Sequence, residues 1–135
     1  MDSVSPARRS EIMGRVRSRD TKPEMTVRRL VHAMGYRYRL YVQGLPGRPD
    51  LVFPRRHKVI FVHGCFWHRH PGCALARLPK SREEFWLTKL EANRRRDIKN
   101  ERALQDDGWG VLIIWECELG SAAGLANKIK EFLDA

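Results

Sequence analysis

The run WGVLIIWEC, residues 109–117, leaves this chain few ways to fold. Residues 111–115 of this run are all apolar, so a strand built from them would be apolar on both faces. Such a strand is typical of the centre of a sheet whose two faces are covered by helices. At 135 residues the chain is long enough for one such core and short for two. We therefore expect a single α/β domain with residues 109–117 as a central strand.

The patterns before this run predict a helix and then a strand. Asp20 or Thr21 can cap a helix that has Pro23 in its first turn and stops at Gly35. In residues 36–42 one set of side chains alternates with another, which is the period of a half-buried strand: Tyr36, Tyr38, Leu40 and Val42 alternate with Arg37, Arg39 and Tyr41.

Further along the chain, residues 50–53 and 58–62 are short apolar runs that flank PRRH, and we expect them to pair as a hairpin. Ser81 and Glu84 match a capping box for a helix that runs, with or without a break, to about Asp107. A closing amphipathic helix carries Leu125, Ile129, Phe132 and Leu133. The order helix, three strands, helix, strand, helix predicts a mixed sheet.

The charge balance indicates the class of partner. Lys and Arg number 26 against 16 Asp and Glu, which gives a net charge of +10 and favours a partner rich in phosphate. An anionic membrane is the alternative, but residues 1–19 offer little bulky apolar surface for it, mainly Ile12, Met13 and Val16. We interpret residues 1–19 as a basic arm or short helix that contacts nucleic acid, and residues 20–135 as one domain.

The first twenty residues also lack the apolar segment of a secretory signal, and the chain has three cysteines, an odd number. No apolar run approaches the roughly 20 residues of a membrane span. We expect a cytoplasmic protein with reduced thiols.

The stretch FVHGCFWHRHPGC, residues 61–73, gathers metal-binding side chains. Cys65, His70 and Cys73 are close enough in sequence to bind one tetrahedral ion, and Cys117 could complete a Cys₃His set. Zinc suits three thiolates and an imidazole, and a closed shell of this kind is structural. Two alternatives remain from the pattern alone: Cys65 and Cys117 could be ordinary buried thiols, and His68 could replace the distant Cys117.

Asp50 raises a second metal hypothesis. It opens a strand directly after GRP, which resembles the first half of the PD-(D/E)xK nuclease motif. In the second half, residues 61–63 replace the acidic-x-Lys element, so Val62 could offer a Mg²⁺ ion only its backbone carbonyl. Glu24 could hold a metal-bound water, because Mg²⁺ usually keeps several waters and takes one or two carboxylates. Asp50 could equally be a routine residue at the start of a strand.

The second helix adds a geometric hypothesis. Trp86, Leu90, Asn93 and Asp97 fall on one face if that helix is continuous. Asp97 would be simply exposed, or it would reach His68, fix the imidazole tautomer and raise its basicity.

Four segments, GRPD (47–50), VHGCFWHRHPGC (62–73), EFWLTKLEANRRRD (84–97) and GWGVLIIWEC (108–117), resemble the very-short-patch repair (Vsr) mismatch endonucleases. The resemblance covers nearly the whole chain, from RSEIMGRVRSRDTKPE onward. It implies a restriction-endonuclease-like, three-layer α/β core around a mixed central sheet, with a structural zinc. It also implies a nick 5′ of the T in a T:G mismatch, which arises when 5-methylcytosine deaminates.

Matched by position, the resemblance implies catalytic Mg²⁺ at Asp50 and the Val62 carbonyl, with Glu24 reached through water. Structural Zn²⁺ would take the Cys₃His set, and residues 20–135 would be the endonuclease domain. Double-stranded DNA with a T:G mismatch would be the partner of a nucleoid-associated monomer, with mismatch-repair proteins as further partners.

The same matching implies that His68 is the base, that Asp97 orients it, and that His63 contacts the scissile phosphate. The residues implied to wedge into the base stack are Phe66, Trp67, Trp86 and, from the opposite groove, Met13. The chain departs from the family pattern in the His70 to Cys73 spacing and in Val62, where a Thr is familiar. Two other functions are weighed against this one: a zinc-stabilised DNA-binding module without catalysis, and a related restriction-type nuclease that acts on other DNA.

Overall fold

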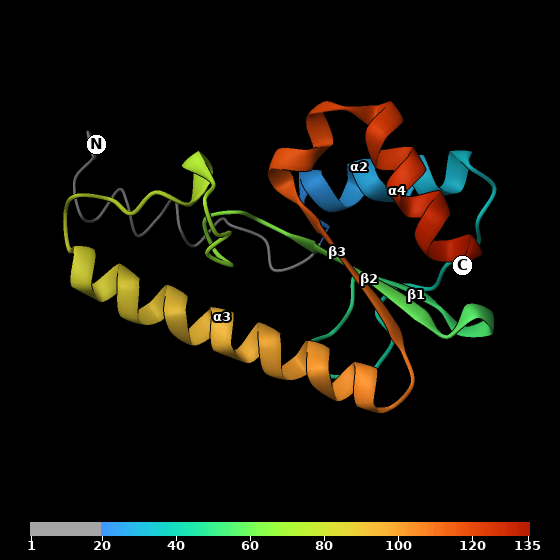
Figure 1. Ribbon diagram of the computed structural model, residues 1–135, viewed down its shortest axis with the longest axis horizontal. Helices are drawn as coiled ribbons and strands as arrows, with labels where there is room; N and C mark the ends of the chain where they lie inside the picture. The colour runs from blue at the N-terminus through green and yellow to red at the C-terminus, as the bar shows by residue number, and fades with distance from the viewer. Residues whose placement is uncertain (1–19) are drawn as a thin grey trace.

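The computed structural model describes residues 20–135, which form a three-stranded sheet with helices on both faces (Figure 1). In chain order the elements are helix α2 (Lys22–Ala33), strand β1 (Leu51–Phe53), strand β2 (Lys58–His63), helix α3 (Glu83–Asp106), strand β3 (Gly110–Trp115) and helix α4 (Ala122–Asp134). Short 3₁₀ turns lie at Pro54–Arg56, Ala74–Ala76 and Glu116–Gly120. The arm assigned to residues 1–19, including Met13, lies outside the described residues.

The sheet is mixed, as predicted. β1 and β2 form an antiparallel hairpin with Leu51 opposite Ile60, whereas β2 and β3 are parallel along their whole length. The order β1-β2-β3 makes β2 the central strand of the described sheet and β3 an edge strand. The prediction that residues 109–117 form a central strand is therefore wrong. β3 is apolar on both sides because helices cover both faces of the sheet, and that coverage does not require a strand on each side.

Side chains that alternate along the strands build two cores, one on each face. On the first face, Ile60, Val62 and Ile114 pack with apolar side chains of α2 and α4. On the opposite face, Phe61 packs with Leu104 of α3. Burial of this kind contributes about 25 cal/mol per Å² of apolar surface, so α2 and α4 are held to one face and α3 to the other (Figure 1).

The strand predicted for residues 36–42 does not form. Only an isolated antiparallel bridge joins Arg39 to Val52, through backbone hydrogen bonds of 2.8 and 3.0 Å. Tyr41 has a φ of 55°, a left-handed conformation that turns the chain away from the sheet. Tyr36 and Tyr38 do pack against the first core, so the alternation reflects which side chains are buried, without continuous pairing.

The cap predicted for the N-terminus of α2 is confirmed, whereas the one predicted for α3 is wrong. Thr21 caps α2 by accepting a hydrogen bond from the Glu24 N–H, as expected. The capping box at Ser81 and Glu84 is wrong, because α3 begins at Glu83 after Arg82 in the left-handed region, with no side-chain cap. α3 is nonetheless one continuous helix of 24 residues. Between residues 20 and 135, no helix combines the length and the apolarity that crossing a bilayer requires.

We expect Gly47→Ala to destabilise the domain by about 1–3 kcal/mol. Gly47 has a φ of +77°, and a Cβ there would lie 3.1 Å from the Asn100 Cβ and 3.2 Å from the Phe61 ring. Gly44→Ala is the matched control, because its φ is +85° but nothing lies within 4 Å of its added Cβ. Thermal unfolding should show the larger loss for Gly47→Ala. Equal losses would mean that close packing between the 43–49 loop and α3 is unimportant.

Candidate active site

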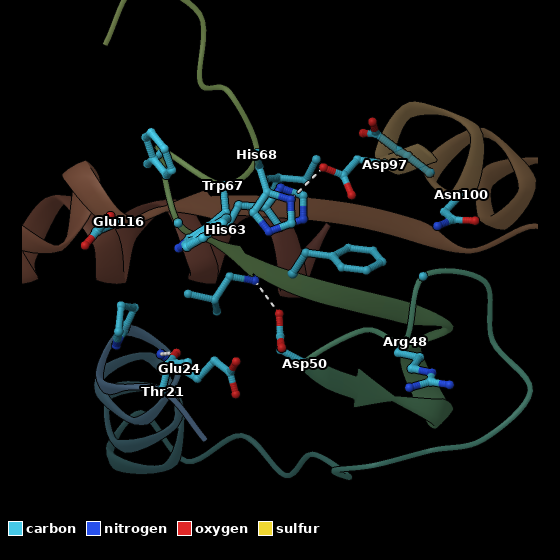
Figure 2. Close-up of a pocket in the computed structure, with 18 of the residues that line it drawn as sticks. Thr21, Glu24, Arg48, Asp50, His63, Trp67, His68, Asp97, Asn100 and Glu116 are labelled. Carbon is cyan, nitrogen blue, oxygen red and sulfur yellow. Dashed lines mark hydrogen bonds and ion pairs between the residues drawn. The ribbon is translucent and has the colours of Figure 1, made fainter. Parts of the chain in front are cut away.

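A cleft of about 840 Å³ opens at the end of β2, between α2, the loop that follows β2, and α3. Its lining includes Glu24, Asp50, His63, His68 and Asp97, and Figure 2 shows them around one space. Five residues from separate segments, each singled out by the sequence, therefore meet in one cavity. The elements that bring them together are α2, the β1–β2 hairpin, the loop after β2, and α3.

Asp50 lies on the floor of the cleft, where the hairpin begins. Its Oδ2 accepts a 2.6 Å hydrogen bond from the Val62 N–H, and its own N–H donates to the Ile60 carbonyl at 3.0 Å. Burial raises the pKa of Asp50 from 3.8 to about 7, opposed by the Val62 hydrogen bond and assisted by the nearby charge of Glu24. A cation beside this carboxylate would therefore favour its ionised form.

Glu24 approaches the same space from α2. It is only 5% exposed, and Figure 2 shows its side chain extending from the helix towards Asp50. Its Oε2 accepts hydrogen bonds from the Asp20 N–H at 2.7 Å and from the Arg28 guanidinium at 3.3 Å. Two acidic side chains thus face one cavity. Arg28 was not among the predicted site residues, although its i, i+4 spacing from Glu24 on a helix was a signal for the pair.

Two histidines form a stacked pair beside the carboxylates. The rings of His63 and His68 are 3.8 Å apart and nearly parallel. His68 Nδ1 lies 2.6 Å from Asp97 Oδ2, so Asp97 fixes the orientation of that ring and leaves Nε2 for the cleft. Burial, and then the neighbouring His68, lower the pKa of His63 to about 4, so His63 is neutral near pH 7.

The predicted face of α3 holds this arrangement in place. Trp86 and Leu90 are buried, the Asn93 amide donates to the Trp67 carbonyl at 3.4 Å, and Asp97 follows one turn later. The alternative of a simply exposed Asp97 is excluded by its contact with His68. Helix α3 therefore holds the loop backbone at Trp67 and, through Asp97, the side chain of His68.

A second cluster lies behind the loop. The ligand atoms of Cys65, His70, Cys73 and Cys117 all lie within 4.8 Å of one another and could hold one metal ion. His68 is not among them. Cys117 is exposed and is therefore not an ordinary buried thiol, whereas Cys65 is buried as that alternative expects. Burial raises the pKa of Cys65 to about 12, so a bound cation would favour the thiolate form there. The donor set fits a soft or borderline metal.

The aromatic residues gather at the other end of the cleft. Phe66, Trp67 and Trp86 contact one another edge to face, with ring centroids 5.2 to 6.0 Å apart. Trp86 is buried, whereas Phe66 and Trp67 are partly exposed. Phe85 was missed by the sequence analysis: it is 46% exposed and packs against Trp86 at 5.3 Å. Its position next to Trp86 in the first turn of the predicted helix could have indicated that Phe85 belongs to the aromatic cluster.

Comparison with known proteins gives consistent matches. A family model described as DNA mismatch endonuclease Vsr matches residues 1–74. The chain is 51% identical over 133 residues to the type II nicking enzyme V.XorIIP of Xanthomonas oryzae pv. oryzae, covering 98% of this chain and 97% of that protein. It is 40% identical over 138 residues to the type II nicking enzyme V.NmeAIP of Neisseria meningitidis, covering 99% and 98%. It is 45% identical over 127 residues to the DNA mismatch endonuclease Vsr of Escherichia coli, covering 94% and 81%.

Proposed function

The chain belongs to the Vsr family of DNA mismatch endonucleases, and from that premise we propose that it is a Mg²⁺-dependent enzyme that nicks DNA 5′ of the T in a T:G mismatch. The nick would start very short patch repair of deaminated 5-methylcytosine. The observation that carries this proposal is the convergence of Asp50, the His63–His68 pair and Asp97 on one cleft. These are the parts that phosphodiester hydrolysis needs: a cation site, a base and a group that orients the base.

Asp50 would hold the Mg²⁺ ion, with the Val62 carbonyl as a further ligand and Glu24 reached through water. The donor set fits, because carboxylate, carbonyl and water oxygens are what Mg²⁺ prefers. The raised pKa of Asp50 also fits, because a cation beside the buried carboxylate would favour its ionised form. When bound, the ion supplies stabilisation of the negative charge that develops on the phosphate and on the leaving oxygen.

His68 would act as general base. Asp97 holds Nδ1 as the N–H donor, so Nε2 has the free lone pair that can accept a proton from the attacking water. The resulting imidazolium is stabilised by the Asp97 carboxylate. The water oxygen would bond to phosphorus as the bond to the 3′ oxygen breaks, which leaves a 3′ hydroxyl and a 5′ phosphate. His63, neutral because of its lowered pKa, would contact the scissile phosphate by hydrogen bonding.

The Cys65, His70, Cys73 and Cys117 cluster would hold a structural Zn²⁺. It would tie the loop after β2 to the end of β3, because Cys117 lies two residues after the last residue of that strand. His68 lies between two of the ligands in sequence, so the same tie would position the base. We include in the proposal a restriction-endonuclease-like core for residues 20–135 and a DNA-contacting arm for residues 1–19.

Phe66, Trp67 and Trp86 would select the lesion by wedging into the base stack, with Met13 acting from the opposite groove. A wobble pair costs less to unstack than a matched pair, so insertion of rings discriminates through deformation energy. The partial exposure of Phe66 and Trp67 at the cleft supports this role. The enzyme would act as a monomer, because a single-strand nick needs one active centre, and mismatch-repair proteins would be further partners.

The test is strand-specific nicking of labelled duplexes that differ only in one base pair. In Mg²⁺ we expect a cut 5′ of the T in the T:G duplex and at least about a hundredfold slower cutting of the matched duplex, the equivalent of about 3 kcal/mol. Equal cutting of both duplexes would favour a related restriction-type nuclease, a reading that the names of the nicking-enzyme relatives keep open. Binding with no cut on any duplex would favour a non-catalytic DNA-binding module.

A further inference from the structure

Arg28 is a buried cation next to the active-site carboxylates that the proposed mechanism does not use. Its side chain is 9% exposed, and its Nη2 donates to Asp20 Oδ1 at 2.8 Å and to Glu24 Oε2 at 3.3 Å. A charge taken out of water is costly unless it is paired. Its pairing with Glu24 therefore suggests a role in the cleft that Glu24 lines.

We propose that Arg28 is the positioning residue of the magnesium site: it fixes Glu24 so that one carboxylate oxygen remains free for a metal-bound water. This inference rests on the proposed Mg²⁺-dependent function. It assigns Arg28 no contact with DNA or with the reacting atoms.

The hydrogen bonds to Glu24 are unevenly divided between its two oxygens. Oε2 accepts from both Arg28 and the Asp20 N–H. Among residues 20–135, no group donates to Oε1. Figure 2 shows the Glu24 side chain directed towards Asp50, so the engaged oxygen anchors the group while the other is available in the cleft.

Arg28 also balances the charge of the site. The Arg28 guanidinium lies within ion-pairing distance of Glu24, and it offsets negative charge where Glu24 and Asp50 line the same cleft. Without the guanidinium, a Mg²⁺ ion would meet a Glu24 side chain that has lost one of its two hydrogen-bond donors and is freer to rotate.

The guanidinium is itself held by neighbouring elements. Nη1 donates to Met25 Sδ at 3.2 Å, Nη2 donates to Asp20 Oδ1 at 2.8 Å, and the guanidinium lies 5.8 Å from the centre of the Tyr41 ring. Its position is therefore set before any ligand arrives. Preorganised outer groups of this kind typically change metal affinity or activity by about 10–100-fold when removed.

The experiment compares Arg28→Met, Arg28→Lys and the control Arg29→Met in the full-length enzyme. Arg29 is the next residue on α2 and is exposed, so its replacement removes the same charge without touching Glu24. We expect Arg28→Met to raise the Mg²⁺ concentration for half-maximal nicking by about 10–100-fold. Arg28→Lys should recover part of that loss, because the lysine ammonium restores the positive charge but lacks the planar set of donors of a guanidinium. Arg29→Met should match the wild type.

Two measurements separate positioning from a general structural role. Binding of the T:G duplex in EDTA should change less than about threefold in Arg28→Met, well below the metal effect expected from an outer-shell change. Mn²⁺ binding, followed by the EPR signal of the free ion in a His68→Ala background that prevents cutting, should weaken by the same factor as the Mg²⁺ response.

A double-substitution cycle gives the deciding result. If Arg28 acts through Glu24, Arg28→Met should have no further effect on the Mg²⁺ response in a Glu24→Gln background. Additive effects of the two changes, or an unchanged Mg²⁺ response in a folded Arg28→Met enzyme, would overturn the role of Arg28. Failure of the proposed function has a different signature, since wild-type nicking would then be independent of Mg²⁺.

Discussion

Asp50→Asn should lower the single-turnover rate of nicking by about three orders of magnitude or more, the equivalent of about 4 kcal/mol in the transition state. The substituted amide can still accept the Val62 hydrogen bond, so the hairpin geometry is kept. The carboxylate charge that would hold the cation is removed. Quenched-flow or gel-based nicking of a T:G duplex in saturating Mg²⁺ measures the loss, and Asp50→Ala should show the same loss of activity.

Two properties serve as controls for this prediction, because the substitution should leave them nearly unchanged: thermal stability and affinity for the T:G duplex. Burial raises the pKa of Asp50, which means that the folded protein disfavours the ionised form. Asp50→Asn should therefore melt no lower than the wild type in EDTA. Its affinity for the T:G duplex in EDTA should also stay within a few-fold, far less than the change in rate. An active Asp50→Asn enzyme would remove Asp50 from the metal site, and with it the proposed mechanism.

Loss of the Cys/His site should have the second-largest effect, this time on stability. Cys73 is half-buried, so Cys73→Ala removes a ligand with little packing cost. Where a metal is bound only by the folded state, its binding free energy adds to folding. We expect a melting temperature lower by roughly 10 °C or more, which corresponds to a few kcal/mol in a domain of this size, together with loss of nicking.

The matched variant is Cys73→His, because Cys₂His₂ sets also bind zinc and should recover most of the stability. Metal analysis of wild-type protein purified without added metal should find about one zinc per chain. Folded, active wild-type protein with no zinc would contradict the structural-zinc proposal. So would a Cys73→Ala variant that melts with the wild type.

The sequence predicted the α/β class, the mixed sheet and all three described helices, because each depends on local periodicity or on a cap. It failed at residues 36–42, where the alternation of side chains is real but the left-handed Tyr41 takes the backbone away from the sheet. It also failed on the place of β3, since burial on both faces does not reveal how many strands lie beside a strand.

In the candidate site, too, features set by local spacing were predictable and features set by tertiary folding were not. Spacing along α3 placed Asp97 on the face that meets His68, and the short Cys/His spacing indicated one cluster. The stack of His63 on His68 and the Val62 N–H that engages Asp50 depend on how a loop folds back over a strand end, which no spacing encodes. Arg28 was not predicted because the i, i+4 spacing from Glu24 indicates a possible ion pair but not that the guanidinium is buried beside the cleft.

The unbroken helix α3 also links two parts of the proposed site. Trp86 and Asp97 are eleven residues apart on one rigid element, a separation of about 16 Å along the axis at 1.5 Å per residue. In the proposed mode of action, one rigid helix would carry both a ring of the aromatic cluster and the carboxylate that orients the base His68. A shift of this helix would therefore displace lesion recognition and incision together.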